Sequence, residues 1–210
     1  MSNIDIIKIK EWLSSVADTY EKNKDYLTQL DSDIGDADHG INMNRGFKLV
    51  KEMINNENKE SISDIFKSTG TILIKNIGGS SGPLYGTFFL NAGILSNNKE
   101  NLSLSDITDI FNKGANAISS LGKSKSGEKT MLDTLFPSLD AMKESINENS
   151  GDAELFKNKV MEAAENGMKS TINMLATKGR ASYLGERSVG HQDPGATSMF
   201  MLIKDLLAIL

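Results

Sequence analysis

Apolar residues recur at alternating steps of three and four along most of the chain, which is the spacing of amphipathic helices. The first stripe contains Ile6, Ile9, Leu13, Val16 and Tyr20, which one helix would bring onto a single face. Comparable stripes predict seven further helices, at about residues 39–55, 62–77, 83–96, 104–121, 131–147, 153–176 and 195–210. The sequence therefore predicts an all-α fold, an up-and-down bundle or barrel of eight helices.

Short-range signals mark two helix starts and leave one segment open to two interpretations. Ser61 with Asp64, and Ser103 with Asp106, have the spacing of capping boxes. The apolar segment TILIKNI at residues 71–77 has the composition of a buried strand. It continues a helical stripe, however, and no hairpin turn lies nearby to pair it, so we predict a helix there.

Four connections carry most of the chemically distinctive residues. They are the aspartate-rich stretch at 30–47, GGSSGP at 78–83, GKSKSGEKT at 122–130 and the long loop at 177–195. Each follows an odd-numbered helix in the predicted order, and such loops gather at one end of an up-and-down bundle. The sequence therefore predicts one composite site at one rim, with plainer turns at the other.

Four aspartates, Asp31, Asp33, Asp36 and Asp38, fall within eight residues with no lysine or arginine between them. Individually they fit solvated turns, and Asp38 fits the N-cap of the next helix. An EF-hand is excluded, because the required glycine and the final bidentate glutamate are missing at the corresponding positions. Clustered carboxylates suit hard cations such as Mg²⁺ or Mn²⁺, whose charge offsets the mutual repulsion. The whole cluster favours a site for two divalent ions.

Several residues are suited to an anionic ligand such as a phosphate. Ser80 and Ser81 lie directly before a helix N-terminus, where free amides favour anions, although GGSSGP also fits a flexible turn. His39 fits a phosphate contact, a metal ligand or a cap, and we favour the first. Arg180 and Arg187 suit phosphate oxygens during transfer, or exposed ion pairs.

Two other segments have simpler interpretations. GKSKSGEKT resembles a P-loop, but Glu128 displaces the lysine by one position and no strand precedes it, so we reject that motif. Its lysines fit a solvated loop or the docking of a partner. The DPG sequence at 193–195 fits the cap and first turn of the last helix.

Composition and charge narrow the class of protein. The chain has 210 residues, of which 39% are hydrophobic and 24% charged, as in one ordinary globular domain spanning 1–210. A net charge of −5 argues against nucleic acid as the main partner. The absence of cysteine excludes disulfides and thiolate metal sites. No segment fits a signal peptide or a membrane span, so we expect no membrane association and a cytoplasmic location.

Three segments, IGDADHGINMNRG, GGSSGPLYGTFF and KGRASYLGERSVGHQDPGA, resemble the signature segments of the nucleotide-binding L subunit of dihydroxyacetone kinase, of the kind that works with the phosphotransferase system. The resemblance covers essentially the whole chain. It implies an eight-helix barrel with ADP and two Mg²⁺ ions at one rim. The metal ligands it implies are Asp31, Asp36 and Asp38, which leaves Asp33 outside the set. The nucleotide contacts it implies are His39, Gly40, Ile41, Asn42, Ser80, Ser81, Gly122, Met131, Arg180, Asp193, Pro194 and Gly195.

The resemblance also implies a reaction and partners. A separate K subunit would hold dihydroxyacetone, which receives the γ-phosphoryl group from the nucleotide on this chain. An M subunit bearing a phosphohistidine would then recharge the tightly bound ADP to ATP in place. Arg180 is the candidate for offsetting charge in the transition state, and the chain alone would be inactive.

Two alternatives remain open at this stage. One is a kinase subunit that exchanges ATP in every cycle while still relying on a separate K subunit. The other is a nucleotide-binding regulatory module that binds a transcription regulator, because a regulator and a catalytic partner can compete for one rim.

Overall fold

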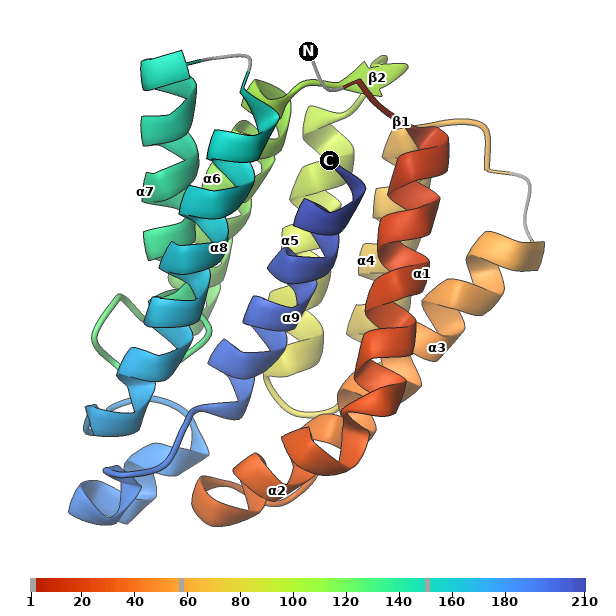
Figure 1. The fold of residues 1–210 in the computed structure, drawn as a ribbon. Coiled ribbons are helices and arrows are strands. Elements are labelled where there is room, and N and C mark those ends of the chain that lie inside the picture. The colour runs from red at the N-terminus through yellow and green to blue at the C-terminus, as the bar shows by residue number, and fades with distance from the viewer. Residues whose placement is uncertain (1–2, 57–58, 150–151) are drawn as a thin grey trace.

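The structure, a computed structural model, describes residues 3–56, 59–149 and 152–210. Within these residues the chain is helical almost throughout (Figure 1). The α-helices are α1 (Ile6–Lys22), α2 (Lys24–Ile34), α3 (His39–Asn56), α4 (Ile62–Asn76), α5 (Ser81–Leu95), α6 (Leu104–Gly122), α7 (Leu132–Asn149), α8 (Ala153–Ser170) and α9 (Pro194–Ile209). The all-α prediction is confirmed, and the segment 71–77 is helical up to Asn76, with Ile77 as the C-cap.

The predicted count of eight helices is corrected by α2, which occupies a region expected to be a loop. The buried positions of α2 are Leu27, Asp31 and Ile34, and their steps of four and three place them on one helical face. The middle position is an aspartate, so the spacing of apolar residues does not reveal this helix. Aspartate also has a low helix propensity, which further hides the helix.

The extra helix does not disturb the predicted separation of the two rims. α2 follows α1 after a turn at Asn23 and lies across the lower end of the molecule in Figure 1, instead of running back along the barrel. α3 therefore still leaves from the lower end, and the later helices keep their directions. The four distinctive connections now follow α2, α4, α6 and α8, and they still meet at one end.

The segment between α8 and α9 has more structure than expected. The predicted helix at 153–176 stops at Ser170 and continues as one 3₁₀ turn, η1 (Thr171–Asn173). A second 3₁₀ segment, η2 (Arg180–Ser188), lies in the predicted loop and is kinked at Gly185. The segment is therefore folded, and it lies beside α2 at the lower end of the molecule (Figure 1).

Two short strands close the opposite end. β1 (Ile4–Asp5) pairs antiparallel with β2 (Asn101–Leu102), with Ile4 opposite Leu102. The sequence pattern did not indicate these strands, because two residues are too few to show a period.

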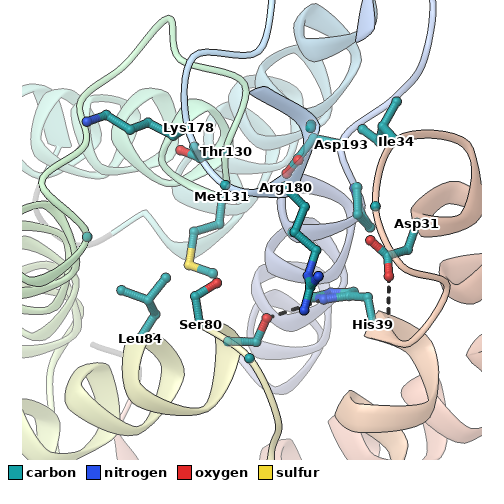
Figure 2. Close-up of a pocket in the computed structure, with 18 of the residues that line it drawn as sticks. Asp31, Ile34, His39, Ser80, Leu84, Thr130, Met131, Lys178, Arg180 and Asp193 are labelled. Carbon is teal, nitrogen blue, oxygen red and sulfur yellow. Dashed lines mark hydrogen bonds between the residues drawn. The ribbon is translucent and has the colours of Figure 1, made fainter. Parts of the chain in front are cut away.

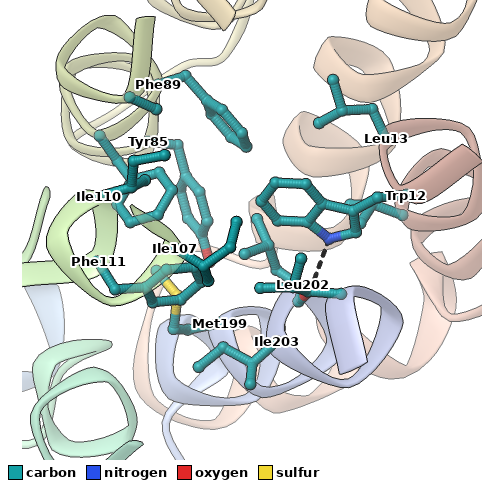
Figure 3. Close-up of a cluster of buried hydrophobic side chains, with 14 of the residues drawn as sticks. Trp12, Leu13, Tyr85, Phe89, Ile107, Ile110, Phe111, Met199, Leu202 and Ile203 are labelled. Atoms are coloured by element: carbon teal, nitrogen blue, oxygen red, sulfur yellow. Dashed lines mark hydrogen bonds between the residues drawn. The ribbon is translucent and has the colours of Figure 1, made fainter. Parts of the chain in front are cut away.

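The helices pack around one main hydrophobic core (Figure 3). Trp12 on α1 donates its indole N–H to the Leu202 carbonyl oxygen on α9 at 3.0 Å, so the first and last helices are joined. α4 and α5 approach closely because Gly70 and Gly86 face each other; a Cβ on Gly86 would lie 2.8 Å from the Gly70 oxygen. Among the described residues, no helix combines the length and apolar character needed to cross a bilayer.

Candidate functional site

A cavity of about 230 Å³ opens at the rim where the distinctive connections meet. One water molecule needs only about 10–15 Å³ on this measure, so the cavity has room for a sizeable ligand. All site residues that the resemblance implies, except Gly40, Ile41 and Asn42, line it, and Asp33 and Arg187 are not among the lining residues. The predicted composite site therefore corresponds to one physical cavity, although the role of each residue in it remains a prediction.

Three carboxylates converge at one side of the cavity. Asp31, Asp36 and Asp38 each offer an oxygen, and these oxygens all lie within 4.8 Å of one another. Asp33 lies outside this group; its Oδ2 is 3.6 Å from His191 Nδ1. This grouping agrees with the ligand set that the resemblance implies.

The local fold explains how the carboxylates are held together. Asp31 lies at the end of α2, and its Oδ2 accepts hydrogen bonds from the amides of Asp38 (2.8 Å) and His39 (3.1 Å) at the start of α3. Between them the chain turns through Ala37, whose φ of 60° is uncommon for a residue with a side chain. The turn directs the carboxylates of Asp36 and Asp38 toward that of Asp31.

The acidic group is suited to a hard divalent cation. Its donors are all carboxylate oxygens, which Mg²⁺ and Mn²⁺ prefer. The C-terminal end of α2, which carries partial negative charge, also favours a cation there. Arg180 contributes a positive charge at the edge of the group, with its Nη2 2.8 Å from Asp36 Oδ2. Asp31, Asp36 and Asp38 are therefore the residues that would hold a metal.

His39 is buried in the cavity wall between the acidic group and the core. Its Nε2 lies 2.8 Å from Ser198 Oγ, and its Nδ1 lies 3.3 Å from Ser81 Oγ. Burial lowers the pKa of His39 to about 4, although Asp31 and Asp38 oppose the shift. A neutral imidazole with both nitrogens engaged is suited to orienting Ser81, and the phosphate contact of His39 stays a prediction.

The start of α5 offers amides to anionic oxygens, whereas the start of α9 carries a buried carboxyl. Ser80, the N-cap of α5, makes no side-chain capping bond, so the first amides of α5 remain available beside the cavity. At α9, Asp193 Oδ2 accepts from the Ala196 amide at 2.6 Å, and Pro194 takes the first helical position. Burial raises the pKa of Asp193 to about 7, with the Ala196 amide and Lys129 opposing the shift.

The opposite side of the cavity is apolar. Leu84, Ile118 and Met131 line it, and in Figure 2 Leu84 and Met131 lie across the cavity from Asp31 and His39. Ala181 also lines the cavity, but it packs with Ile34 on the acidic side. Met131 was implied only by the resemblance. Leu84, Ile118 and Ala181 were not predicted, because at sequence level they are indistinguishable from apolar core positions.

Three predicted contacts lie in the first turns of α3, outside the cavity lining. Gly40 packs against α2, where a Cβ would lie 2.0 Å from the Lys24 oxygen. Ile41 is 49% exposed. Asn42 is buried and its Oδ1 accepts from Arg45 Nη2 at 2.6 Å. Their part in nucleotide binding stays a prediction.

Comparisons with known proteins agree on one family. Residues 33–208 match the family model described as the DAK2 domain. The chain is 44% identical over 196 residues to "PEP-dependent dihydroxyacetone kinase, ADP-binding subunit DhaL" of Escherichia coli K12, with 93% of each chain covered. It is 38% identical over 201 residues to the PTS-dependent counterpart of Lactococcus lactis, with 95% of each covered.

A solved structure has the same fold. The dihydroxyacetone kinase of C. freundii, in complex with AMP-PNP and Mg²⁺, matches with a TM-score of 0.75 at 22% identity. The match covers 99% of this chain and 35% of that one. At this level of identity the likeness establishes the architecture of the helical barrel.

Proposed function

Because the chain belongs to the family of ADP-binding L subunits of dihydroxyacetone kinases that depend on phosphoenolpyruvate and the phosphotransferase system, we propose that its rim cavity holds ADP with two Mg²⁺ ions. In this proposal the nucleotide stays bound and passes its γ-phosphoryl group to dihydroxyacetone on a separate K subunit. A phosphohistidine-bearing M subunit then recharges it in place. We place this cycle in the cytoplasm.

The observation that carries the proposal is the division of one cavity into an acidic side and an apolar side. The acidic group of Asp31, Asp36 and Asp38 suits metal-bound phosphates. The apolar side with Met131 and Leu84 suits a nucleotide base. The helix start at Ser81 borders the same cavity and favours anionic oxygens. A nucleoside diphosphate has the matching groups, with an apolar base at one end and phosphates that bind metal at the other.

In this proposal different residues of the chain bind the metal, position the phosphates and assist transfer. When bound, Mg²⁺ would offset the negative charge of the phosphate oxygens. The three aspartates would hold the ions, and the α5 amides would position the phosphates. Arg180, with its planar guanidinium beside Asp36, would face charge that develops on the transferring group. The chain need not supply a nucleophile, because the accepting hydroxyl belongs to dihydroxyacetone.

Partner subunits would have to reach the same rim. Tyr183 on η2 is 88% exposed, which is unusual for an aromatic side chain and suits a contact surface. Lys123 and Lys125 are exposed on the neighbouring loop. We propose that acidic and apolar groups on the K and M subunits meet these residues in turn.

Reconstitution tests the proposal. The chain is loaded with labelled ADP and Mg²⁺ and mixed with the K subunit, dihydroxyacetone and phosphohistidine-bearing M subunit. We expect many molecules of dihydroxyacetone phosphate per chain, with the labelled ADP still bound after a chase of unlabelled ADP. Formation of product from free ATP with rapid loss of label would instead support the ATP-exchanging subunit. No product with either donor would overturn the transferase proposal.

A further inference from the structure

Lys129 is a buried lysine in the cavity wall, with only 1% of its surface exposed. Its Nζ donates hydrogen bonds to the backbone oxygens of Thr171 (2.6 Å), Met174 (3.2 Å) and His191 (2.5 Å). An ammonium group has three hydrogens. All three are used within the protein, so this lysine has no donor left for a phosphate.

The three acceptors belong to one segment, residues 171–193, which links α8 to α9. Thr171 lies at its beginning and His191 near its end, so one ammonium group binds both ends of the segment. Thr171 Oγ1 also accepts a hydrogen bond from the Asp193 amide at 3.0 Å, which links the two ends of the segment directly. Arg180 lies on the part of the chain between these fixed points.

The backbone around Lys129 is fixed in turn. Its φ of 62° is strained for a lysine and persists only where the surroundings determine it. The next amide, of Thr130, donates to Asp133 Oδ2 at 2.7 Å. Met131 follows and lies against the α9 turn, where a Cβ on Gly195 would be 3.6 Å from the Met131 nitrogen. The side chain of Lys129 therefore links two walls of the cavity.

We propose that Lys129 is a positioning residue that clamps the 171–193 segment and so holds Arg180 and the Asp193–Gly195 turn in register with Met131. The proposal rests on the proposed function only in taking this cavity as the nucleotide site. In this proposal Lys129 holds the wall of the cavity in place. It does not bind phosphate, which is the role that a lysine in a glycine-containing loop would suggest from the sequence.

Removal of the clamp should loosen the segment and release nucleotide faster. Lys129→Met keeps the length of the side chain but removes its charge and donors. We expect dissociation of fluorescent ADP in Mg²⁺ to become about tenfold faster or more, equivalent to about 1.4 kcal/mol per factor of ten. We also expect faster trypsin cleavage after Lys178, Arg180 or Arg187, measured by mass spectrometry. Lys143→Met, at an exposed lysine of α7, should change neither rate.

A restored ammonium should restore the clamp. The chain contains no cysteine, so a Lys129→Cys variant can be aminoethylated at one position while unfolded and then refolded. We expect this product to regain slow ADP dissociation and resistance to trypsin, which the unmodified cysteine variant lacks. Val160→Ala, a core truncation on α8, controls for lost stability and should leave both rates near those of the wild type.

A milder variant covers the case in which Lys129→Met does not fold. Thr171→Val removes the hydroxyl that binds the Asp193 amide and leaves the Thr171 carbonyl in place. It should raise both rates in the same direction by a smaller factor. Wild-type rates of ADP dissociation and trypsin cleavage in Lys129→Met would overturn the clamp. If Lys129→Met does not fold, wild-type rates in Thr171→Val would do so. Failure of the aminoethylated Lys129→Cys variant to regain slow rates would also overturn it. If the wild type binds no ADP, the proposed function fails, and cleavage alone decides the clamp.

Discussion

The two rims of the barrel differ in how they satisfy the first amides of their helices. α1, α4, α6 and α8 begin at the rim far from the cavity, and each is capped by the side chain directly before it. The capping bonds run from the amides of Lys8, Asp64, Asp106 and Leu155 to the side chains of Asp5, Ser61, Ser103 and Asp152, at 2.9 to 3.1 Å. These amides have no capacity left for a ligand.

At the cavity rim, the starts of α3 and α5 do not follow this pattern. α3 is capped by Asp31 from α2, seven and eight residues earlier in the chain. α5 has no side-chain cap. α9 is capped locally by Asp193, but the amide of Asp193 donates to Thr171 Oγ1, 22 residues earlier in the chain. At the far rim local caps occupy the amides, whereas at the cavity rim the support of α3 by Asp31 and the uncapped start of α5 leave donors and charges directed at a shared cavity.

The largest effect should follow loss of a carboxylate at the cavity rim. Asp38→Asn or Asp36→Asn should abolish Mg²⁺-dependent ADP binding, because even the loss of a residue that only supports a metal ligand costs about 10–100-fold in metal affinity. Helical circular dichroism should be unchanged, because little core is touched. Titration calorimetry measures the binding. Asp33→Asn is the matched control, and wild-type binding by both test variants would remove the metal assignment.

A second effect concerns transfer more than binding. Arg180→Ala should slow phosphoryl transfer in the reconstituted system by on the order of 100-fold, because a guanidinium is worth more as charge develops than in the ground state. ADP affinity should change by much less. Arg187→Ala, on the same 3₁₀ segment but outside the cavity lining, is the control. An unchanged transfer rate would make Arg180 a surface ion-pair residue.

The buried carboxyl at the cavity rim should make stability depend on pH. Because the folded-state pKa of Asp193 is raised from 3.8 to about 7, the folded state binds its proton more tightly than the unfolded state does. The free energy of unfolding should therefore fall as pH rises through this window, by up to about 4 kcal/mol at 1.36 kcal/mol per unit.

Asp193→Asn keeps a good capping residue and removes that titration. Urea unfolding of the metal-free proteins, at intervals from pH 4 to pH 8, measures the difference between variant and wild type. The advantage of the variant should grow with pH up to about 7 and then level off. A difference that does not vary with pH would show that Asp193 is not destabilised by burial.

The smallest effect should come from the far rim. Ser103→Ala removes one half of the capping box of α6 and should cost about 1 kcal/mol, or about 2–4 °C in Tm for a chain of this size. ADP affinity should stay at the wild-type value. Ser105→Ala, at an exposed serine in the same first turn, controls for the substitution. A change in ADP affinity with Ser103→Ala would break the separation of the two rims.

The sequence predicted the helical class and the gathering of four distinctive connections at one rim. Both follow from the spacing of apolar residues and the order of the loops, which are properties of the chain itself. α2 was missed because Asp31 interrupts its buried stripe at the position where an apolar residue would have revealed it. The residue that hid the helix is the one that caps α3 and joins the acidic group.

Lys129 shows the other limit of sequence reasoning. The lysines of its loop fit a solvated segment or a docking surface, and for Lys123 and Lys125 exposure agrees with that interpretation. Lys129 is buried, and its acceptors lie 42, 45 and 62 residues away in the chain. No local pattern encodes such partners, because they are brought together only when α7, α8 and α9 pack.

The central claim is that the cavity rim holds ADP with divalent metal as a resident cofactor. The most direct measurement is to desalt the purified chain in Mg²⁺ buffer, denature it, and quantify the released nucleotide and metal by mass spectrometry. The account predicts close to one ADP and about two divalent ions per chain, as a group of carboxylates and phosphates requires. A chain that releases no nucleotide, and binds none when ADP and Mg²⁺ are added, would contradict it.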